Sequence, residues 1–297
     1  MAKKLVKYCV VDAFTESAFK GNPAAVCLLE EEKDDTWLQA VATEFNISQT
    51  CFLTRIASDS VSTNPQFGLR WFTPVVEVQL CGHGTLATSH FLFSSGLVDA
   101  DVIEFLTLSG ILTAKRVPDP KISIGAPFEN GNECHGVSVE LSFPALTLSD
   151  YDSPDKLTDS PSLSSVSTLE IKKTPYDDLF IVLPSGKAVA EYQPQFDEIQ
   201  KLPGRGLIIT GLAPPGSGFD FYSRFFCPKY GINEDPVCGS AHCALAPYWC
   251  QKLEKTELVA YQASPRGGTI NLYVDEENQR ILIRGKSVTV MEGSLLA

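Results

Sequence analysis

The chain has 297 residues, of which 44% are hydrophobic and 20% charged, a composition that excludes a disordered protein and is typical of a globular one. Its 36 acidic and 24 basic residues give a net charge of −12, which argues against nucleic acid as a partner. No apolar run approaches the roughly 18 residues that span a membrane. We therefore expect a cytoplasmic protein with no membrane partner.

The first half of the chain alternates apolar runs typical of strands with helical periodicities. Strands are predicted at 6–14, 22–29, 50–56, 67–72, 102–110 and 111–117, the last two as a hairpin. Helices are predicted at 34–45 and 84–96, and the second of these begins and ends on glycine.

A segment rich in Ser, Asp and Pro, residues 148–168, predicts an exposed connection or an irregular helical segment near the middle of the chain. Beyond it, strands are predicted at 179–183, 206–210, 219–226, 260–262, 269–274, 281–285 and 288–293. Helices are predicted at 196–201 and 240–252. Strands dominate, which indicates an α+β fold.

The two halves contain a repeated motif. The segment Arg70–Pro74 is followed by Cys81-Gly and a helix, and the segment Arg224–Pro228 is followed by Cys238-Gly and a helix. The loop between proline and cysteine differs in length, which surface loops tolerate. We therefore expect two pseudo-equivalent lobes, residues 1–125 and 126–297, with the last strands able to pack back on the first lobe.

Cys81 and Cys238 are candidate catalytic residues. A cysteine at a helix start lies near the positive end of the helix dipole, which favours the thiolate. The backbone N–H groups around the two cysteines are candidates for binding a carboxylate: Gly82, His83, Gly239 and Ser240. If the lobes face one another, one thiolate removes a proton beside a carboxyl group and the opposite thiol delivers one, without a cofactor.

Other interpretations of this motif remain open. Both cysteines are equally compatible with buried, inert thiols, as the remaining seven are expected to be. His83 and Asp235 are candidate acid/base groups, although Asp235 is as compatible with helix capping. A metal site on Cys81, His83, Cys238, His242 and Cys243 lacks the usual ligand spacing, so we predict no metal.

Several segments, taken together, resemble the phenazine biosynthesis PhzF-like family, within the larger group of diaminopimelate epimerase and proline racemase. The resemblance spans nearly the whole chain. The motifs that carry it are 11–14 (VDAF), 20–26 (KGNPAAV), 44–50 (EFNISQT), 70–74 (RWFTP), 80–85 (LCGHGT), 220–226 and 234–242.

The resemblance implies two similar lobes, each a small barrel-like sheet around a central helix, with the active site between them. It also implies proton movement on a small carboxylate without a cofactor, often in a homodimer. In PhzF-like enzymes a glutamate shuttles the proton with help from a histidine, an aspartate and a serine. The last three match His83, Asp235 and Ser240.

The chain departs from the family at the glutamate, because Gln49 stands in its place. Glutamine cannot exchange a proton as a carboxylic acid does, but its amide still offers hydrogen bonds to a ligand. Cys81 and Cys238, in contrast, occupy the positions of the catalytic thiols in diaminopimelate epimerase and proline racemase.

The sequence therefore predicts a cofactor-independent racemase or epimerase of a small carboxylate, with Cys81 and Cys238 as the acid/base pair. Residues expected to bind or orient the substrate are Asn22, Gln49, Gly82, His83, Asp235, Gly239 and Ser240. One alternative is a PhzF-like isomerase of a dihydro-hydroxyanthranilate that uses His83 and Asp235. Another is a family member that binds a metabolite or protein without catalysis.

Overall fold

The computed structural model describes residues 5–56, 64–118, 138–152, 157, 163 and 167–296. The chain divides into two compact units. The N-terminal unit consists of Met1–Ser142 with Arg284–Ala297, and the C-terminal unit is Phe143–Ile283. The boundary that the sequence suggests, between residues 125 and 126, lies outside the described residues.

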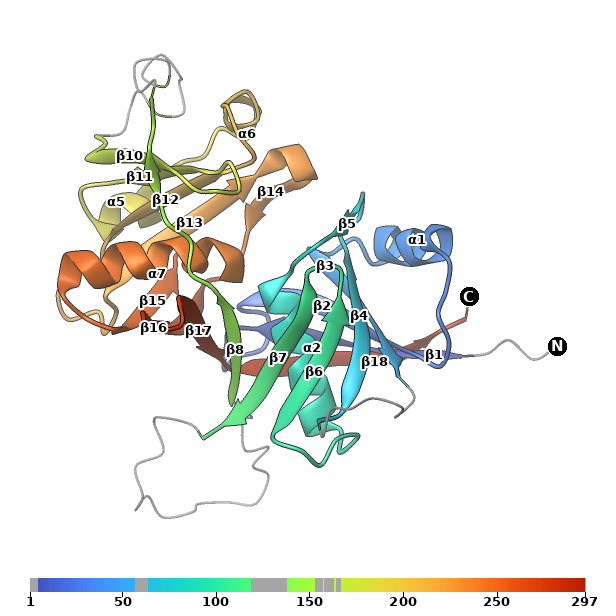
Figure 1. The fold of residues 1–297 in the computed structure, drawn as a ribbon. Helices are drawn as coiled ribbons and strands as arrows, with labels where there is room; N and C mark the ends of the chain where they lie inside the picture. Colours follow the sequence, from blue (N-terminus) through green and yellow to red (C-terminus); the bar gives the residue numbers. More distant parts are fainter. Residues whose placement is uncertain are drawn as a thin grey trace. The chain divides into compact units, whose positions relative to one another are not determined.

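The N-terminal unit is a mixed sheet with two helices (Figure 1). Its strands are β1 (Val6–Ala13), β2 (Asn22–Leu29), β3 (Gln49–Arg55), β4 (Gln66–Phe72), β5 (Glu77–Val78), β6 (Val102–Thr107), β7 (Gly110–Val117), β8 (Ser138–Pro144) and β18 (Ser287–Leu295). Its helices are α1 (Asp35–Phe45) and α2 (Gly82–Ser94).

The strands of the N-terminal unit pair in a fixed order. Strand β1 is antiparallel to β18 and β2, β2 is parallel to β3, and β3 is antiparallel to β4. Strand β4 is antiparallel to β5 and parallel to β6, and β6–β7–β8 continue antiparallel. Helix α2 is buried on nearly all sides and contacts β1, β2, β3, β7 and β18, so the sheet curves around it.

The C-terminal unit repeats this plan. Its strands are β9 (Ser149–Asp150), β10 (Glu170–Lys173), β11 (Leu179–Val182), β12 (Leu207–Leu212), β13 (Phe221–Cys227), β14 (Ile232–Asp235), β15 (Glu257–Gln262), β16 (Gly268–Asp275) and β17 (Arg280–Gly285). Its helices are α5 (Gly186–Glu191), α6 (Phe196–Ile199) and α7 (Gly239–Leu253), with a 3₁₀ turn η1 (Pro228–Tyr230).

The pairing order of the C-terminal unit matches that of the N-terminal unit strand for strand. Strands β10 to β13 pair antiparallel, parallel and antiparallel, as β1 to β4 do. Strand β13 is antiparallel to β14 and parallel to β15, and β15 is antiparallel to β16, which reproduces β4 to β7. Helix α7 therefore corresponds to α2, and the expectation of an α+β fold with two pseudo-equivalent lobes is confirmed.

An outer helix layer completes each unit. In the N-terminal unit, Leu38, Val41 and Ala42 of α1 pack on Phe52 and neighbouring apolar side chains of the sheet. In the C-terminal unit, helices α5 and α6 contribute Val189 and Ile199 to a cluster on β11, β12 and β13. Each sheet thus buries one face on its central helix and part of the other under short helices.

Most predicted strands and helices appear within a few residues of their expected positions. Six elements were not predicted from the sequence: β5, β8, β9, β10, β14 and α5. The connection predicted at 148–168 lies largely outside the described residues, although β9 occupies part of its beginning. Among the described residues, no helix is both long and apolar enough to cross a membrane.

Candidate active site

Cys81 is the N-cap residue of the central helix α2 and is 6% exposed. Its Sγ accepts a hydrogen bond from the Gly84 backbone N–H at 3.3 Å. Its carbonyl oxygen accepts hydrogen bonds from the backbone N–H and the hydroxyl of Thr85, at 3.1 and 2.6 Å. The sulfur thus occupies the place that a capping oxygen takes in most helices, facing the N–H groups of the first turn.

His83 lies in the first turn of α2, directly beside this thiol. Its Nδ1 is 3.5 Å from the Sγ of Cys81, and its Nε2 is 3.4 Å from the hydroxyl of Ser48. Burial lowers the pKa of His83 to about 3, which keeps the imidazole neutral at pH 7. His83 can therefore exchange hydrogen bonds with the thiol and with Ser48, but it is not an imidazolium that would hold a thiolate.

Ser48 connects this cluster to Asn22, the first residue of β2. The Ser48 hydroxyl lies 2.7 Å from the Asn22 Oδ1 and 2.8 Å from the Pro23 carbonyl oxygen. Ser48 was not predicted as a site residue. In the sequence, only the position of Ser48 within the Asn46–Gln49 motif pointed to it. Its contact with His83, 35 residues later, depends on the fold.

Gln49 begins β3 and is only 3% exposed. Its amide Nε2 is buried and has no hydrogen-bond partner among the described residues. Because a buried amide without a partner is costly, a group of this kind in a folded protein requires an explanation. A ligand acceptor that is bound during function is one such explanation.

Cys238 is the N-cap residue of α7, at the position in the C-terminal unit that corresponds to Cys81. Its backbone N–H donates to the Oε1 of Gln262 at 2.8 Å, and the Gln262 amide donates to the Asp235 carbonyl. Its Sγ lies 3.3 Å from the Ser240 hydroxyl. Burial and then the nearby Asp235 carboxylate raise the pKa of Cys238 well above that of a free thiol. Cys238 is therefore protonated at neutral pH.

His242 faces the interior of its own unit. Its Nδ1 lies 2.7 Å from the Cys238 carbonyl oxygen, one turn earlier, and its ring stacks on Phe221 at 5.9 Å. Its Nε2 is 3.4 Å from the Ser223 hydroxyl, and burial lowers its pKa to about 4. His242 has the contacts of a structural imidazole. Among the described residues, no group of three His, Cys, Asp or Glu side chains is placed to hold a metal ion.

Each cysteine is preceded by an arginine–glutamate pair that positions its loop. Arg70 binds both carboxylate oxygens of Glu77 at 2.7 Å, and Arg224 binds both oxygens of Glu234 at 2.7 and 2.8 Å. Both glutamates lie four residues before the cysteine of their unit. These glutamates were not predicted as site residues, although the spacing Glu-x-x-x-Cys-Gly occurs in both halves of the sequence.

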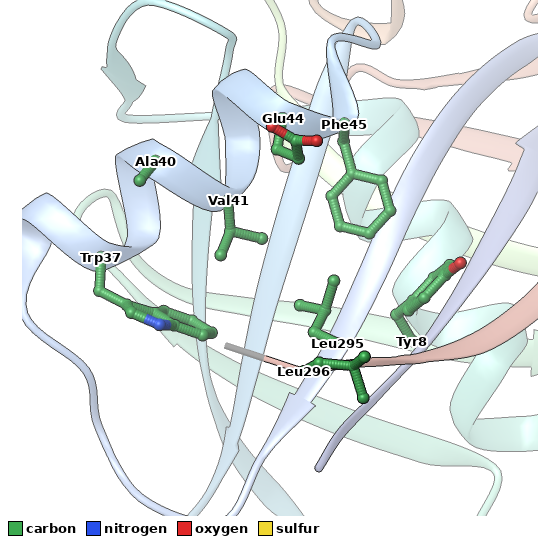
Figure 2. Close-up of a pocket in the computed structure, with 8 residues that line it drawn as sticks. All are labelled: Tyr8, Trp37, Ala40, Val41, Glu44, Phe45, Leu295 and Leu296. Atoms are coloured by element: carbon green, nitrogen blue, oxygen red, sulfur yellow. The ribbon is translucent and has the colours of Figure 1, made fainter. Parts of the chain in front are cut away.

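An apolar groove of the N-terminal unit lies on other residues. It has a volume of about 600 Å³ and lies between α1 and the ends of β1 and β18. Figure 2 shows Trp37, Val41 and Phe45 of α1 facing Tyr8 and Leu295. Glu44 is the acidic residue of its lining. The groove is apolar and offers no pair of acid/base groups.

Within the N-terminal unit, the structure thus gathers most of the predicted residues at the start of α2. Cys81, Gly82 and His83 lie in or beside its first turn, and Ser48 connects His83 to Asn22. Within the C-terminal unit, the start of α7 gathers a second set, which consists of Asp235, Cys238, Gly239 and Ser240.

The duplicated sheet, with a cysteine at the start of each central helix, defines a class of two-lobed α+β proteins. A family model described as phenazine biosynthesis-like protein matches residues 11–293, and the chain belongs to this family. It is 40% identical over 289 residues to an uncharacterized isomerase of Halalkalibacterium halodurans, with 97% of each chain covered. The resemblance noted in the sequence is therefore confirmed.

Solved structures agree with this assignment. A phenazine biosynthesis protein of the PhzF family from Enterococcus faecalis superposes with a TM-score of 0.82 and 35% identity, covering 98% of this chain and 99% of that one. A hydroxyproline epimerase from Agrobacterium vitis, solved with trans-4-hydroxy-L-proline, has a TM-score of 0.61 at 11% identity, with coverage of 99% and 93%. The second likeness shows the fold that the two proteins share.

Proposed function

We propose that this protein is a cofactor-independent isomerase of the racemase or epimerase type. It moves a proton at a carbon beside the carboxyl group of a small substrate, with Cys81 and Cys238 as the acid/base pair. The observation that carries the proposal is the duplication itself. A cysteine is the N-cap residue of the central helix in both units, and an Arg–Glu pair precedes each one.

The state of each cysteine suggests its role. Cys238 is held as a thiol by burial and by Asp235, which suits the group that gives a proton. Cys81 accepts the Gly84 backbone N–H at the positive end of α2, which favours its thiolate and suits the group that receives a proton. In one turnover Cys81 takes the proton from carbon and Cys238 delivers its own proton to the opposite face. The thiols end with exchanged protonation states, and the reverse reaction restores them.

The remaining residues would bind the substrate and stabilise its carbanion. The N–H groups of the first turns, at Gly82 and His83 and at Gly239 and Ser240, suit a carboxylate oxygen. Asn22 and Gln49 supply amides beside the first of these turns, and Asp235 acts through the thiol of Cys238. Preorganised donors in a buried site supply the stabilisation that a weakly acidic C–H needs.

Deuterium incorporation at carbon in heavy water tests the proposal directly. A suitable panel contains both enantiomers of several amino acids, hydroxyproline and cyclic dienoic amino acids. We expect Cys81→Ser and Cys238→Ser each to reduce the interconversion of the two enantiomers by about 10³-fold or more, because inversion needs both members of the acid/base pair. Cys250→Ser, near the other end of α7, is the matched control and should retain full exchange.

The panel also distinguishes the two alternatives. Exchange that persists in both single cysteine variants but is lost in His83→Gln would assign proton transfer to His83 and Asp235, as in the PhzF-like alternative. Ligands that bind without any exchange at carbon would identify a binding protein. Either outcome would overturn the thiol pair.

A further inference from the structure

Two cysteine thiols of the N-terminal unit converge on Gly84, in the first turn of α2. The Cys81 Sγ accepts a hydrogen bond from the Gly84 backbone N–H at 3.3 Å, and the Cys51 thiol of β3 donates to the Gly84 carbonyl oxygen at 3.5 Å. A Cβ atom on Gly84 would lie 2.8 Å from the Cys51 Sγ and 3.0 Å from the Cys81 Sγ. The two sulfurs are therefore no further apart than these two distances together.

The glycine at position 84 leaves room for the two sulfurs to approach one another. Any other residue would place its Cβ at the point that both sulfurs adjoin. Rotation about the Cα–Cβ bond moves a cysteine sulfur between staggered positions. A disulfide needs a sulfur–sulfur distance of about 2.05 Å, and rotation of the two side chains toward this point reduces their separation. Both cysteines are reduced in the structure.

The sheet register sets Cys51 apart from the other thiols on neighbouring strands. Cys27 of β2 is one residue away from the position paired with Cys51, so its side chain points to the opposite face. Cys9 of β1 shares the face of Cys51, but Val26 is paired with both and lies between them. Two strand spacings, roughly 9–10 Å, thus separate Cys9 from Cys51. Among the described cysteines of the N-terminal unit, Cys81 is the partner that the fold gives Cys51.

The two thiols differ in the reactivity that their surroundings give them. Cys81 is 6% exposed and lies at the positive end of the α2 dipole, which favours its thiolate. Cys51 is fully buried, and burial raises its pKa to about 12. A thiolate is the form that peroxide oxidises, and a neighbouring thiol then converts the sulfenic acid to a disulfide. Cys81 therefore suits the first of these roles and Cys51 the second.

We propose that Cys81 is an oxidation site for hydrogen peroxide and that Cys51 converts its sulfenic acid to a disulfide within the N-terminal unit. The Cys81 thiolate attacks one peroxide oxygen, the O–O bond breaks, and hydroxide leaves and takes up a proton as water. The Cys51 sulfur then attacks the Cys81 sulfur, so that the S–S bond forms and the S–O bond breaks. The hydroxyl group leaves with the Cys51 proton as a second water.

The disulfide protects Cys81 from irreversible damage. Sulfinic acid, the next product of peroxide on a sulfenic acid, is not reduced by thiols, whereas a disulfide is. The two electrons that reduce the peroxide come from the two thiols, and a dithiol returns them. Neither oxidation step requires the proposed isomerase activity.

Peptide mapping of the full-length protein after mild hydrogen peroxide tests the inference. Trypsin releases Cys51 in peptide 34–55 and Cys81 in peptide 71–115, and neither peptide contains another cysteine. We expect peroxide to join these two peptides and dithiothreitol to separate them. Thiols are blocked with N-ethylmaleimide before digestion, so that disulfides do not exchange. Cys27, alone in peptide 21–33, is the internal control and should remain unlinked.

Cys51→Ala removes the resolving thiol and should let the Cys81 sulfenic acid accumulate. Labelling of Cys81 by dimedone, a reagent for sulfenic acids, should be about tenfold or more higher than in the wild type. Prolonged peroxide should then carry Cys81 to sulfinic acid, which dithiothreitol does not reverse. Cys27→Ala is the matched variant, since it removes a buried thiol from the next strand, and it should behave as the wild type. The Tm of each variant without peroxide checks that it is folded.

The wild-type protein decides the inference even without the variants. Cys81 that is oxidised without a link to Cys51 would overturn it, and so would Cys81 that stays reduced. Equal linkage of Cys51 to Cys9 or Cys27 would also overturn it, because the register excludes both.

Substrate conversion distinguishes this inference from the proposed function. If Cys81 belongs to the acid/base pair, peroxide should abolish the interconversion of enantiomers and dithiothreitol should restore it. A disulfide that forms while interconversion continues would support the oxidation site and contradict the thiol pair. Interconversion without any link between Cys51 and Cys81 after peroxide would do the reverse.

Discussion

Arg224 and Glu234 form a nearly buried ion pair in which both carboxylate oxygens accept from one guanidinium, at 2.7 and 2.8 Å. The side chains are 7% and 11% exposed. The same guanidinium also donates to the Tyr192 carbonyl oxygen at 2.6 Å. Because Glu234 lies four residues before Cys238, this pair fixes β14 on β13 and thereby the start of α7.

Replacement of Glu234 by Gln should destabilise the protein strongly. It leaves a buried guanidinium without its counter-charge, which costs about 3–5 kcal/mol. Glu77→Gln is the matched control from the other unit, because the side chains of Arg70 and Glu77 are 35% and 21% exposed. Its free energy of unfolding should fall by only about 1 kcal/mol. Urea unfolding monitored by fluorescence measures both. Equal losses would show that burial does not distinguish the two pairs.

Gly84→Ala should reduce both stability and activity, although alanine normally favours a helix. The new Cβ would lie 2.8 Å from the Cys51 Sγ, 2.9 Å from the Trp71 ring and 3.0 Å from the Cys81 Sγ. Overpacking of this kind costs about 1–3 kcal/mol and exceeds the helix gain of about 1 kcal/mol. The displaced thiol should also lower the exchange rate about tenfold or more.

Gly68→Ala provides the comparison, since its Cβ would have no neighbour closer than 3.8 Å. It should change the Tm and the exchange rate little. A Gly84→Ala variant that is as stable and active as Gly68→Ala would contradict the close packing at the start of α2.

The buried histidines should make stability fall in mild acid. Burial lowers the pKa of His83 to about 3, and those of His90 and His242 to about 4, below the value of about 6.5 in an unfolded chain. The unfolded state therefore binds protons that the folded state does not. The contribution of these neutral histidines to stability is complete above pH 6.5 and is lost progressively as the pH falls, toward about 4 for His90 and His242 and toward about 3 for His83.

His90 provides the test, because its Nδ1 is buried without a partner among the described residues. Between pH 7 and pH 5, the free energy of unfolding should fall by about 1–2 kcal/mol less in His90→Leu than in the wild type. Urea unfolding at the two pH values gives the comparison. A variant with the same pH dependence as the wild type would show that His90 does not titrate on unfolding.

The Asp235 carboxylate should control the reactivity of Cys238. Its charge is the second cause, after burial, of the raised pKa of this thiol. Asp235→Asn removes the charge and should increase alkylation of Cys238 by iodoacetamide at pH 8 about threefold or more, because the thiolate is the reacting form.

Cys250 of the same helix is the internal reference for this experiment, since Asp235 is not among the causes of its raised pKa, which is about 11. Peptide fragmentation by mass spectrometry assigns the alkylated position. If Cys238 and Cys250 were modified faster by the same factor, the variant would have loosened the unit as a whole and the electrostatic explanation would fail.

The missed elements show where sequence patterns are weak. Strand β10 is half-exposed along its whole length and has no alternation, so its state depends on pairing with β9 and β11. Helix α5 is short, and its main local signal is the Ser185 cap on Ala188. Strands β5 and β14 are short, and their Arg–Glu pairs join residues of neighbouring strands. Local periodicity cannot reveal elements that long-range contacts create.

The sequence alone determined the duplicated Arg…Pro…Cys-Gly motif, the long apolar strands, both central helices and the family resemblance. These features depend on local periodicity, on capping residues and on residue order, which can be read along the chain. Only the tertiary structure decided that the Ser48 hydroxyl contacts the His83 imidazole. It also decided that the side-chain N–H groups of Gln49 and Trp71 are buried. Strand register and helix placement set these relationships, because they fix which face each side chain occupies and which residues distant in sequence lie opposite it.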